Sequence, residues 1–422
     1  MNDKSPAPLS AVEICAGAGG QALGLHRAGF RHEIAVELDP TAAATLSANL
    51  PVKVAVGDVA DPSVWSPRDF LGIDLLAGGV PCPPFSMAGK QLGSADERDL
   101  FAWAVEQVGV MQPRALLLEN VRGLASPRFR AYRQRILDRL AEYGYLASWR
   151  LLQASGFGLA QLRPRFVLVA LRPEEAAYFH WPEPRADSPT VASSLVDLMA
   201  ANGWPFAEEW ARLASGVGPT LVGGSKKHGG ADLGPTRAKQ AWARLGVDGG
   251  GVADSAPGRD APHPSVKLPK LTLEMVARLQ GWDEASEWTF SGRKTSQYRQ
   301  IGNAFPPPVA EAVGRAIASA LRHEGTRSNT AELESPTHDP VYTLLSKSND
   351  FVHIGALEES TDSKPGPEEV ESHLAVIARD FELEVKTTSS GTYYKLGPFK
   401  GFTGQGSHQR HEFMAKHKSK VS

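Results

Sequence analysis

The chain has 422 residues and a formal net charge of −2, from 45 Lys plus Arg and 47 Asp plus Glu. This length exceeds one ordinary domain and predicts two or three. The balanced charge excludes a strongly basic protein, so any surface for nucleic acid must be a local patch.

The 2 cysteines, Cys15 and Cys82, are too few for a disulfide framework or a structural zinc site, and no metal site is predicted. The N-terminal residues lack an apolar signal core, and no run of 18 apolar residues occurs. We therefore expect a cytoplasmic protein without a membrane span.

Residues 9–171 alternate short apolar runs with amphipathic segments, which indicates an α/β domain whose mostly parallel sheet has helices on both faces. The candidate strands are residues 11–14, 32–38, 52–56, 73–78, 114–120 and 166–171. Ligands of open α/β sheets bind outside the carboxyl ends of the strands. Asp58, Cys82 and Glu119 stand at such ends and are site candidates as a group.

A glycine-rich loop, residues 13–20, joins the first candidate strand to the helical segment 21–30. Its glycines allow a cofactor to approach the backbone closely. Glu37 can bind both hydroxyls of a ribose, and Asp58 can accept from an adenine amino group. The dinucleotide fingerprint G-x-G-x-x-G is absent, so a nucleoside pocket is predicted, one that suits a sulfonium-bearing nucleoside.

The fourth candidate strand leads into residues 78–86, where prolines bracket the thiol of Cys82. Proline fixes φ and removes backbone donors, so this loop can hold the sulfur in one place. A lone cysteine is more often a small buried side chain, but this setting favours a nucleophile. Cys15, at an apolar strand end, is expected to pack.

Two further groups stand near strand ends. Glu119, in Leu118-Glu119-Asn120-Val121, lies beside Cys82 if their two strands are neighbours; the alternative is a helix cap or a surface carboxylate. Arg163 and Arg165 fall on the same side of an extended run, where they suit a phosphate or a carboxylate.

Residues 172–270 are rich in Gly, Pro and Trp and show no sustained helical or strand period. Basic residues lie among glycines at their centre: Lys226, Lys227, Arg237 and Lys239. A solvated irregular insertion is the alternative to a binding role. Helical patterns return at residues 271–282 and 307–324, the second after the prolines that suit a helix start.

The remaining chain changes character twice. Residues 326–366 are polar and acidic and are interpreted as linker or disorder. Residues 368–385 have the pattern of a helix followed by a strand, and the basic last residues predict a flexible tail or nonspecific DNA contact.

Seven motifs, in order between residues 9 and 321, resemble those of DNA cytosine-5 methyltransferases of the bacterial restriction-modification type. They are E-I-C-A-G-A-G-G, V-E-L-D, G-D-V, P-C-P-P-F-S, E-N-V, Q-L-R-P-R and Y-R-Q-I-G-N-A-F-P-P-P-V-A. The Pro-Cys motif and E-N-V are highly specific, whereas the glycine loop alone is not. Cys15 stands where the family commonly has an aromatic residue, and Pro83 where it often has Gln.

The resemblance implies a Rossmann-like S-adenosylmethionine-dependent methyltransferase fold with a smaller target recognition domain. The implied divisions are a catalytic and cofactor domain, the recognition domain, a return to the catalytic domain, a linker and a small C-terminal extension: residues 1–171, 172–270, 271–325, 326–366 and 367–422. Implied S-adenosylmethionine contacts are Cys15, Ala16, Gly17, Ala18, Gly19, Gly20, Glu37, Leu38, Asp58, Val59, Pro81 and Asn303. Implied DNA contacts are Ser86, Lys226, Lys227 and Arg237.

The implied mechanism fits the chemistry of these residues. Cys82 would add to carbon 6 of cytosine while Glu119 serves nitrogen 3, with Arg163 or Arg165 assisting. Carbon 5 then takes the methyl group, and loss of its proton and expulsion of Cys82 complete the cycle. The cytosine must be flipped out of the duplex to reach this pocket.

The expected partners are double-stranded DNA and, as a genetic partner, a cognate restriction endonuclease; the expected state is a monomer. Four alternatives remain. An amino-methyltransferase would need Asp or Asn where Cys82 stands, and an NAD-dependent oxidoreductase would need the missing fingerprint. A tRNA cytosine-5 methyltransferase would share the chemistry, and a noncatalytic DNA-binding regulator would share the scaffold.

Overall fold

The computed structural model describes residues 7–81, 98–223, 230–282, 286–328, 333, 339–359 and 367–399. Within these ranges a seven-stranded sheet has the order β3-β2-β1-β4-β5-β7-β6. Its strands are β1 (Leu9–Ile14), β2 (Phe30–Glu37), β3 (Val54–Val56), β4 (Leu75–Gly79), β5 (Ala115–Val121), β6 (Leu146–Gln153) and β7 (Pro164–Leu171). Strands β1 to β5 are parallel, and β7 runs antiparallel to both of its neighbours. The α/β fold with a mostly parallel sheet is confirmed.

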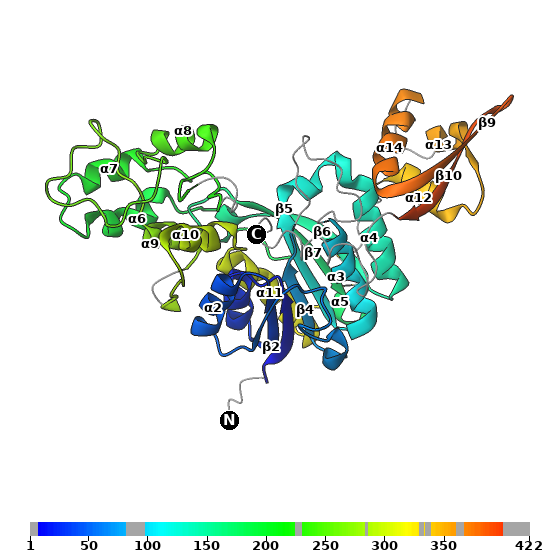
Figure 1. Ribbon diagram of the computed structural model, residues 1–422, viewed down its shortest axis with the longest axis horizontal. Helices are drawn as coiled ribbons and strands as arrows, with labels where there is room; N and C mark the ends of the chain where they lie inside the picture. Colours follow the sequence, from blue (N-terminus) through cyan, green and yellow to red (C-terminus); the bar gives the residue numbers. More distant parts are fainter. Residues whose placement is uncertain are drawn as a thin grey trace.

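Helices cover both faces of the sheet (Figure 1). Successive side chains of a strand point to opposite faces, so Val12 packs with residues of α3 and α4, whereas Ala11 packs with residues of α1 and α11. The helix predicted after the prolines is α11, which begins at Pro307 and closes the sheet against α1. The bounds of the covering helices are α1 (Gly20–Arg27), α2 (Pro40–Asn49), α3 (Arg98–Met111), α4 (Arg130–Glu142) and α11 (Pro307–Leu321).

The predicted strands all occur, but β6 (Leu146–Gln153) lies outside them. It is an edge strand whose residues are mostly half-buried or exposed, including Arg150 and Gln153. The apolar run that marks a buried strand is therefore absent from its sequence.

The segment after β7 contains helices that the sequence does not predict. Those between residues 191 and 303 form a separate core that includes three buried tryptophans, Trp204, Trp210 and Trp242. Each helix is short, and the segments between the helices contain Gly or Pro, so no long period develops. The helices of this region are α5 (Pro173–Ala176), α6 (Val191–Ala200), α7 (Ala207–Leu213), α8 (Thr236–Arg244), α9 (Leu273–Gln280) and α10 (Lys294–Asn303), of which α9 is predicted.

Residues 339–359 and 367–399, here called the C-terminal module, lie at the opposite end of the molecule from α6 to α8 (Figure 1). The module has a three-stranded sheet of order β8-β10-β9. The expectation of a linker at residues 326–366 is wrong for 340–359, because the few apolar residues there are buried against the rest of the module. Its elements are α12 (Pro340–Lys347), β8 (Val352–His353), α13 (Ile354–Glu359), α14 (Pro367–Asp380), β9 (Phe381–Thr388) and β10 (Gly391–Phe399), and α14 followed by β9 confirms the predicted helix and strand.

None of the helices in the described part of the chain is both long and apolar enough to span a membrane.

Candidate active site

The loop after β1 bends back toward the end of β2. Cys15, Gly17 and Gly19 have φ angles of 52°, 57° and 89°, in the left-handed region that favours glycine. The N–H of Gly17 donates to Oε2 of Glu37 at 2.6 Å, and the N–H of Asp39 donates to Oε1 at 2.7 Å. Glu37 therefore fixes the loop, and the side chain of Cys15 packs at the edge of the sheet core, as expected.

The donors and acceptors at this edge fit a nucleoside. Burial raises the pKa of Glu37, and the N–H groups of Asp39 and Gly17 oppose that rise. Each carboxyl oxygen keeps a further lone pair, so Glu37 can also accept ribose hydroxyls. Leu38 beside it is 39% exposed, and Oδ1 of Asp58 accepts the N–H of Ala60 at 3.0 Å. The exposed side chain of Leu38 and the carboxylates of Glu37 and Asp58, which stand at or just after the ends of neighbouring strands, suit an adenosine group.

A tryptophan that sequence reasoning missed touches this loop. A Cβ added at Gly19 would lie 2.7 Å from the side chain of Trp288, and one added at Gly20 would lie 2.4 Å from the carbonyl oxygen of Phe305. The glycines are thus required by close packing at the helix start. Trp288 stands about 270 residues away in sequence, and no local pattern marks it.

The strands β4 and β5 are neighbours, as the placement of Glu119 beside Cys82 requires. Gly79 is paired with Glu119, and a Cβ on Gly79 would lie 3.5 Å from Oε2 of Glu119. Glu119 therefore faces the strand end that leads through Pro81 to Cys82. Cys82 itself lies outside the described residues.

Asn120 joins the same two strand ends. Its Nδ2 donates to the carbonyl oxygen of Val80 at 3.1 Å, and its Oδ1 accepts the N–H of Val121 at 2.8 Å. The side chain is buried. No sequence motif predicts a separate role for Asn120, although alternation along the strand places it on the opposite face of β5 from Glu119.

Replacement of Asn120 by alanine is expected to slow methyl transfer about 10-fold, because the carbonyl of Val80 loses the donor that fixes the approach to Cys82. The free energy of unfolding should fall by about 1–2 kcal/mol. Single-turnover kinetics and urea unfolding measure the two effects. The matched control is Asn202→Ala, which removes an amide donor to the carbonyl of Ala256 in another region; equal slowing in both variants would contradict the role.

Glu119 forms a buried ion pair with Arg165. Oε1 of Glu119 lies 2.5 Å from Nε of Arg165, and the two side chains are 10% and 9% exposed. Burial raises the pKa of Glu119, and Arg165 and Arg163 oppose that rise. A carboxyl group balanced in this way can both donate and accept a proton at a bound base.

Arg163 has different partners from Arg165. Its guanidinium donates to the carbonyl oxygens of Leu221, Gly302 and Ala304 at 2.6, 2.7 and 2.9 Å. Gln161 also contacts the backbone of Leu221, since its Oε1 accepts the N–H of Leu221 at 2.8 Å. Of the two arginines predicted to lie on the same side of an extended run, Arg165 contacts Glu119, whereas Arg163 links Leu221 to the end of α10.

The other predicted residues are dispersed. Asn303 ends α10, is exposed, and lies against the backbone of Gly223. Arg237 is exposed on α8, whose buried residue is Trp242. Ser86, Lys226 and Lys227 lie outside the described residues.

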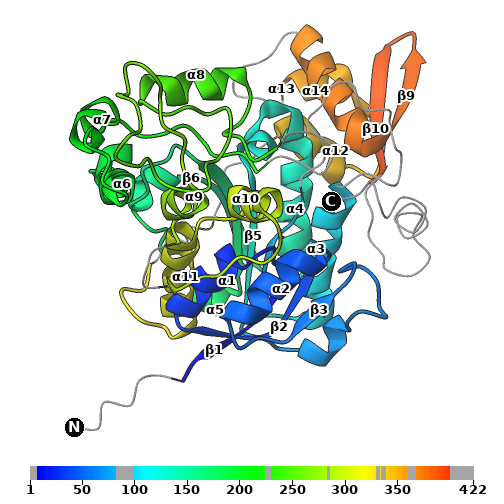
Figure 2. The ribbon, with the colours of Figure 1, turned by 60° about the vertical axis from the view of Figure 1, so that its left-hand side comes forward.

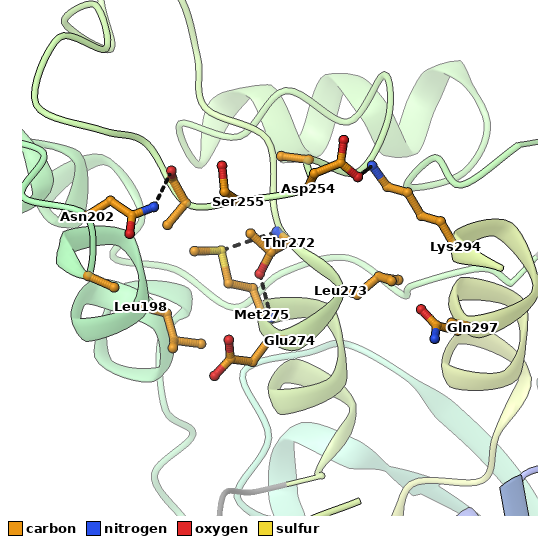
Figure 3. Close-up of a pocket in the computed structure, with 13 residues that line it drawn as sticks. Leu198, Asn202, Asp254, Ser255, Thr272, Leu273, Glu274, Met275, Lys294 and Gln297 are labelled. Atoms are coloured by element: carbon orange, nitrogen blue, oxygen red, sulfur yellow. Dashed lines mark hydrogen bonds and ion pairs between the residues drawn. The ribbon is translucent and has the colours of Figure 1, made fainter. Parts of the chain in front are cut away.

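A pocket of about 460 Å³ lies elsewhere, between α6, α9 and α10 (Figure 3). At its edge Nζ of Lys294 is 2.8 Å from Oδ1 of Asp254, and Nδ2 of Asn202 donates to Ala256. It contains none of the predicted site residues. The carboxyl edge of the sheet, where Glu37, Glu119 and Arg165 lie, remains the candidate active site.

The chain matches the family described as C-5 cytosine-specific DNA methylase over residues 9–319. Type II methyltransferase M.NaeI of Lentzea aerocolonigenes is 61% identical over 416 residues, which cover 98% of this chain and 99% of that protein. Type II methyltransferase M.NgoMIV of Neisseria gonorrhoeae is 48% identical over 321 residues, 75% of this chain and 99% of that protein.

Two solved structures share the fold. The methyltransferase EhMeth of Entamoeba histolytica has a TM-score of 0.51 at 14% identity and covers 75% of this chain and 99% of its own. A variant of Spodoptera frugiperda DNMT2 has a TM-score of 0.50 at 16% identity, with 74% and 99% covered.

Proposed function

Because the chain belongs to the C-5 cytosine-specific DNA methylase family, we propose that it methylates one cytosine within a specific duplex sequence through a transient covalent adduct with Cys82. The family membership makes it a DNA (cytosine-5) methyltransferase that uses S-adenosylmethionine. The proposal adds the base flipping, the adduct and the residue roles. We further propose that the enzyme is a monomer and that it acts as the modification part of a restriction-modification system.

The observation that carries the residue roles is the buried pair of Glu119 and Arg165 beside the strand end that precedes Cys82. The thiolate of Cys82 forms a bond to carbon 6, and the electron pair of the ring moves toward nitrogen 3 and carbon 5. Glu119 donates its proton at nitrogen 3, and Arg165 holds that carboxyl in position.

S-adenosylmethionine supplies the methyl group when bound. Glu37 and Asp58 are proposed to hold its adenosine part, with Leu38, Val59, Pro81 and the backbone of residues 15–20 around it. After carbon 5 is methylated, its proton leaves to water, the bond to Cys82 breaks, and Glu119 takes its proton back. Asn303 is proposed to line the same pocket.

Residues 172–270 are proposed as the target recognition domain, with residues 271–325 returning to the catalytic domain. Arg237 supports this assignment because it is a cation on the exposed side of α8. Ser86, Lys226 and Lys227 complete the proposed DNA contacts from the sequence alone.

The test is incubation with labelled S-adenosylmethionine and mixed-sequence duplex DNA, followed by base-resolution mapping of methylated positions. Methyl groups on carbon 5 of cytosine at one short recurrent site are expected. Transfer to tRNA without labelling of DNA would overturn the proposal in favour of an RNA-modifying enzyme, and binding of DNA without any transfer would favour a noncatalytic regulator.

A further inference from the structure

The C-terminal module packs against a helix of the catalytic domain. Ala131 of α4 is fully buried in a cluster with Val341, Tyr342 and Leu345 of α12 and with Ile377 of α14. Figure 2 shows the module beside the upper end of α4, on the far side of α4 from α8. The module is therefore joined to the catalytic domain by a core rather than by a flexible connection.

Aromatic rings continue from that core into the catalytic domain. Within the module, ring centroids are 5.0 Å apart for Tyr342 and Phe381 and 5.2 Å apart for Phe381 and Phe399. The ring of Phe399 lies 6.0 Å from that of Tyr132 on α4. These separations are those of favourable aromatic pairs.

The same series of contacts crosses the catalytic domain to the sheet. Tyr132 lies 6.4 Å from Phe101 of α3, Phe101 is stacked 5.5 Å from Trp149 of β6, and Trp149 is stacked 4.8 Å from Phe166 of β7. The seven rings are called the ring series below: Tyr342, Phe381, Phe399, Tyr132, Phe101, Trp149 and Phe166.

The last ring belongs to the residue next to Arg165, and its side chain lies on the opposite face of β7 from Arg165. Phe166 directly follows Arg165 in β7, and its backbone is paired with Asn120 of β5, the residue next to Glu119. Phe101 lies near the start of α3, the helix that follows the Cys82 segment in the chain. The ring series thus reaches both strands that carry the proposed catalytic groups.

Polar contacts also connect the C-terminal module to α4, and α4 to the turn after β5. Asp339 at the start of α12 is fully buried, and its Oδ2 lies 4.0 Å from Nε of Arg130 on α4. One turn further along, Arg133 donates to the carbonyl oxygens of Leu124 and Ser126, in the turn that follows β5. The guanidinium carbon of Arg133 lies 5.8 Å from the centre of the Phe166 ring.

We propose that the C-terminal module is a positioning element of the active site, with Phe399 as the residue that transmits its support through the ring series to Arg165 and Glu119. Packed rings resist displacement because moving one of them forfeits contacts on both sides. Small displacements of catalytic groups reduce rates strongly. The inference rests on the proposed roles of Glu119 and Arg165.

The two relatives match different shares of this chain. The match with M.NaeI covers 98% of the chain and so extends into the module. The match with M.NgoMIV covers 99% of that protein but leaves a quarter of this chain without a counterpart. Because the rings affect the position of Glu119 and Arg165 and take no part in the reaction, loss of the support should slow turnover without abolishing it.

The experiment replaces Phe399 by alanine in the full chain. We expect kcat to fall about 10-fold, with KM for duplex DNA and for S-adenosylmethionine changed by less than about twofold, because positioning and not binding is lost. Amide hydrogen exchange at the carboxyl end of β5 and at the start of β7 should become faster. Phe399→Tyr, which keeps the ring, should restore both measurements.

The matched control is Phe351→Ala, which removes a half-buried ring whose recorded partners, Lys386 and Lys395, belong to the module itself. This variant should leave kcat and the exchange of β5 and β7 unchanged. Equal effects in the two alanine variants, or unchanged exchange in Phe399→Ala, would overturn the inference. Phe399→Leu serves if the alanine variant fails to fold.

The exchange measurement separates this inference from the proposed function. If the wild-type protein transfers no methyl group to DNA, the proposed function fails, whereas the comparison of exchange rates still decides whether the module supports β5 and β7.

Discussion

Replacing Cys82 by serine is expected to reduce methyl transfer at least about 1000-fold, because a hydroxyl of normal pKa cannot take the place of a thiolate that adds to carbon 6. Folding, measured by circular dichroism, and binding of S-adenosylmethionine, measured by calorimetry, should stay close to those of the wild type. Most of the proposed cofactor residues follow β1, β2 and β3, and of that site only Pro81 adjoins Cys82.

The adduct can be located directly. Duplex DNA that carries fluorine at carbon 5 of the mapped cytosine cannot lose a proton there, so the covalent complex should accumulate. Peptide mass analysis should place the DNA on Cys82 and not on Cys15. Unfolding of Cys82→Ser would instead favour a buried packing thiol, and an adduct on Cys15 would contradict the assignment.

Glu119→Gln is expected to lower kcat by about 10² to 10⁴-fold, the contribution of a positioned acid at nitrogen 3. The matched control is Glu175→Gln, which alters another buried carboxylate paired with an arginine, since Oε1 of Glu175 lies 2.9 Å from Nε of Arg114. This control should retain the wild-type rate. Near-normal turnover of Glu119→Gln would remove the proposed role.

The pH dependence of kcat tests the same group. Burial raises the pKa of Glu119, so at a given pH more of this carboxyl is protonated than in an ordinary glutamate. The protonated form is the donor to nitrogen 3, and kcat should therefore fall as pH rises through that pKa. The profile of Glu119→Gln should lack this descending limb; an unchanged profile would assign the limb to another group.

The sequence predicts the parallel part of the sheet well, because its strands are short apolar runs that end in glycines or carboxylates. It also places Gly79 and Glu119 on adjacent strands once the order of the strands is assumed. It could not show that β7 runs antiparallel between β5 and β6, and this arrangement is what brings Arg165 to Glu119.

The residues that were missed share one physical property. Asn120 and Trp288 act through contacts with residues far from them in sequence or on another strand. Arg163 appears equivalent to Arg165 by alternation, yet its partners are three backbone carbonyls supplied by later parts of the chain. Such contacts depend on the tertiary fold and produce no periodic pattern in the sequence. The helices around Trp204 and α12 were missed because each is short, so that no helical period extends over several turns.

The contacts of Arg163 and Gln161 with Leu221 use only main-chain atoms of that residue. Hydrogen bonds to the backbone of a residue do not depend on which side chain that residue carries. The proposed target recognition domain can therefore exchange its side chains during evolution, and with them the DNA sequence that we propose it prefers, while its attachment to the rest of the protein is inherited unchanged.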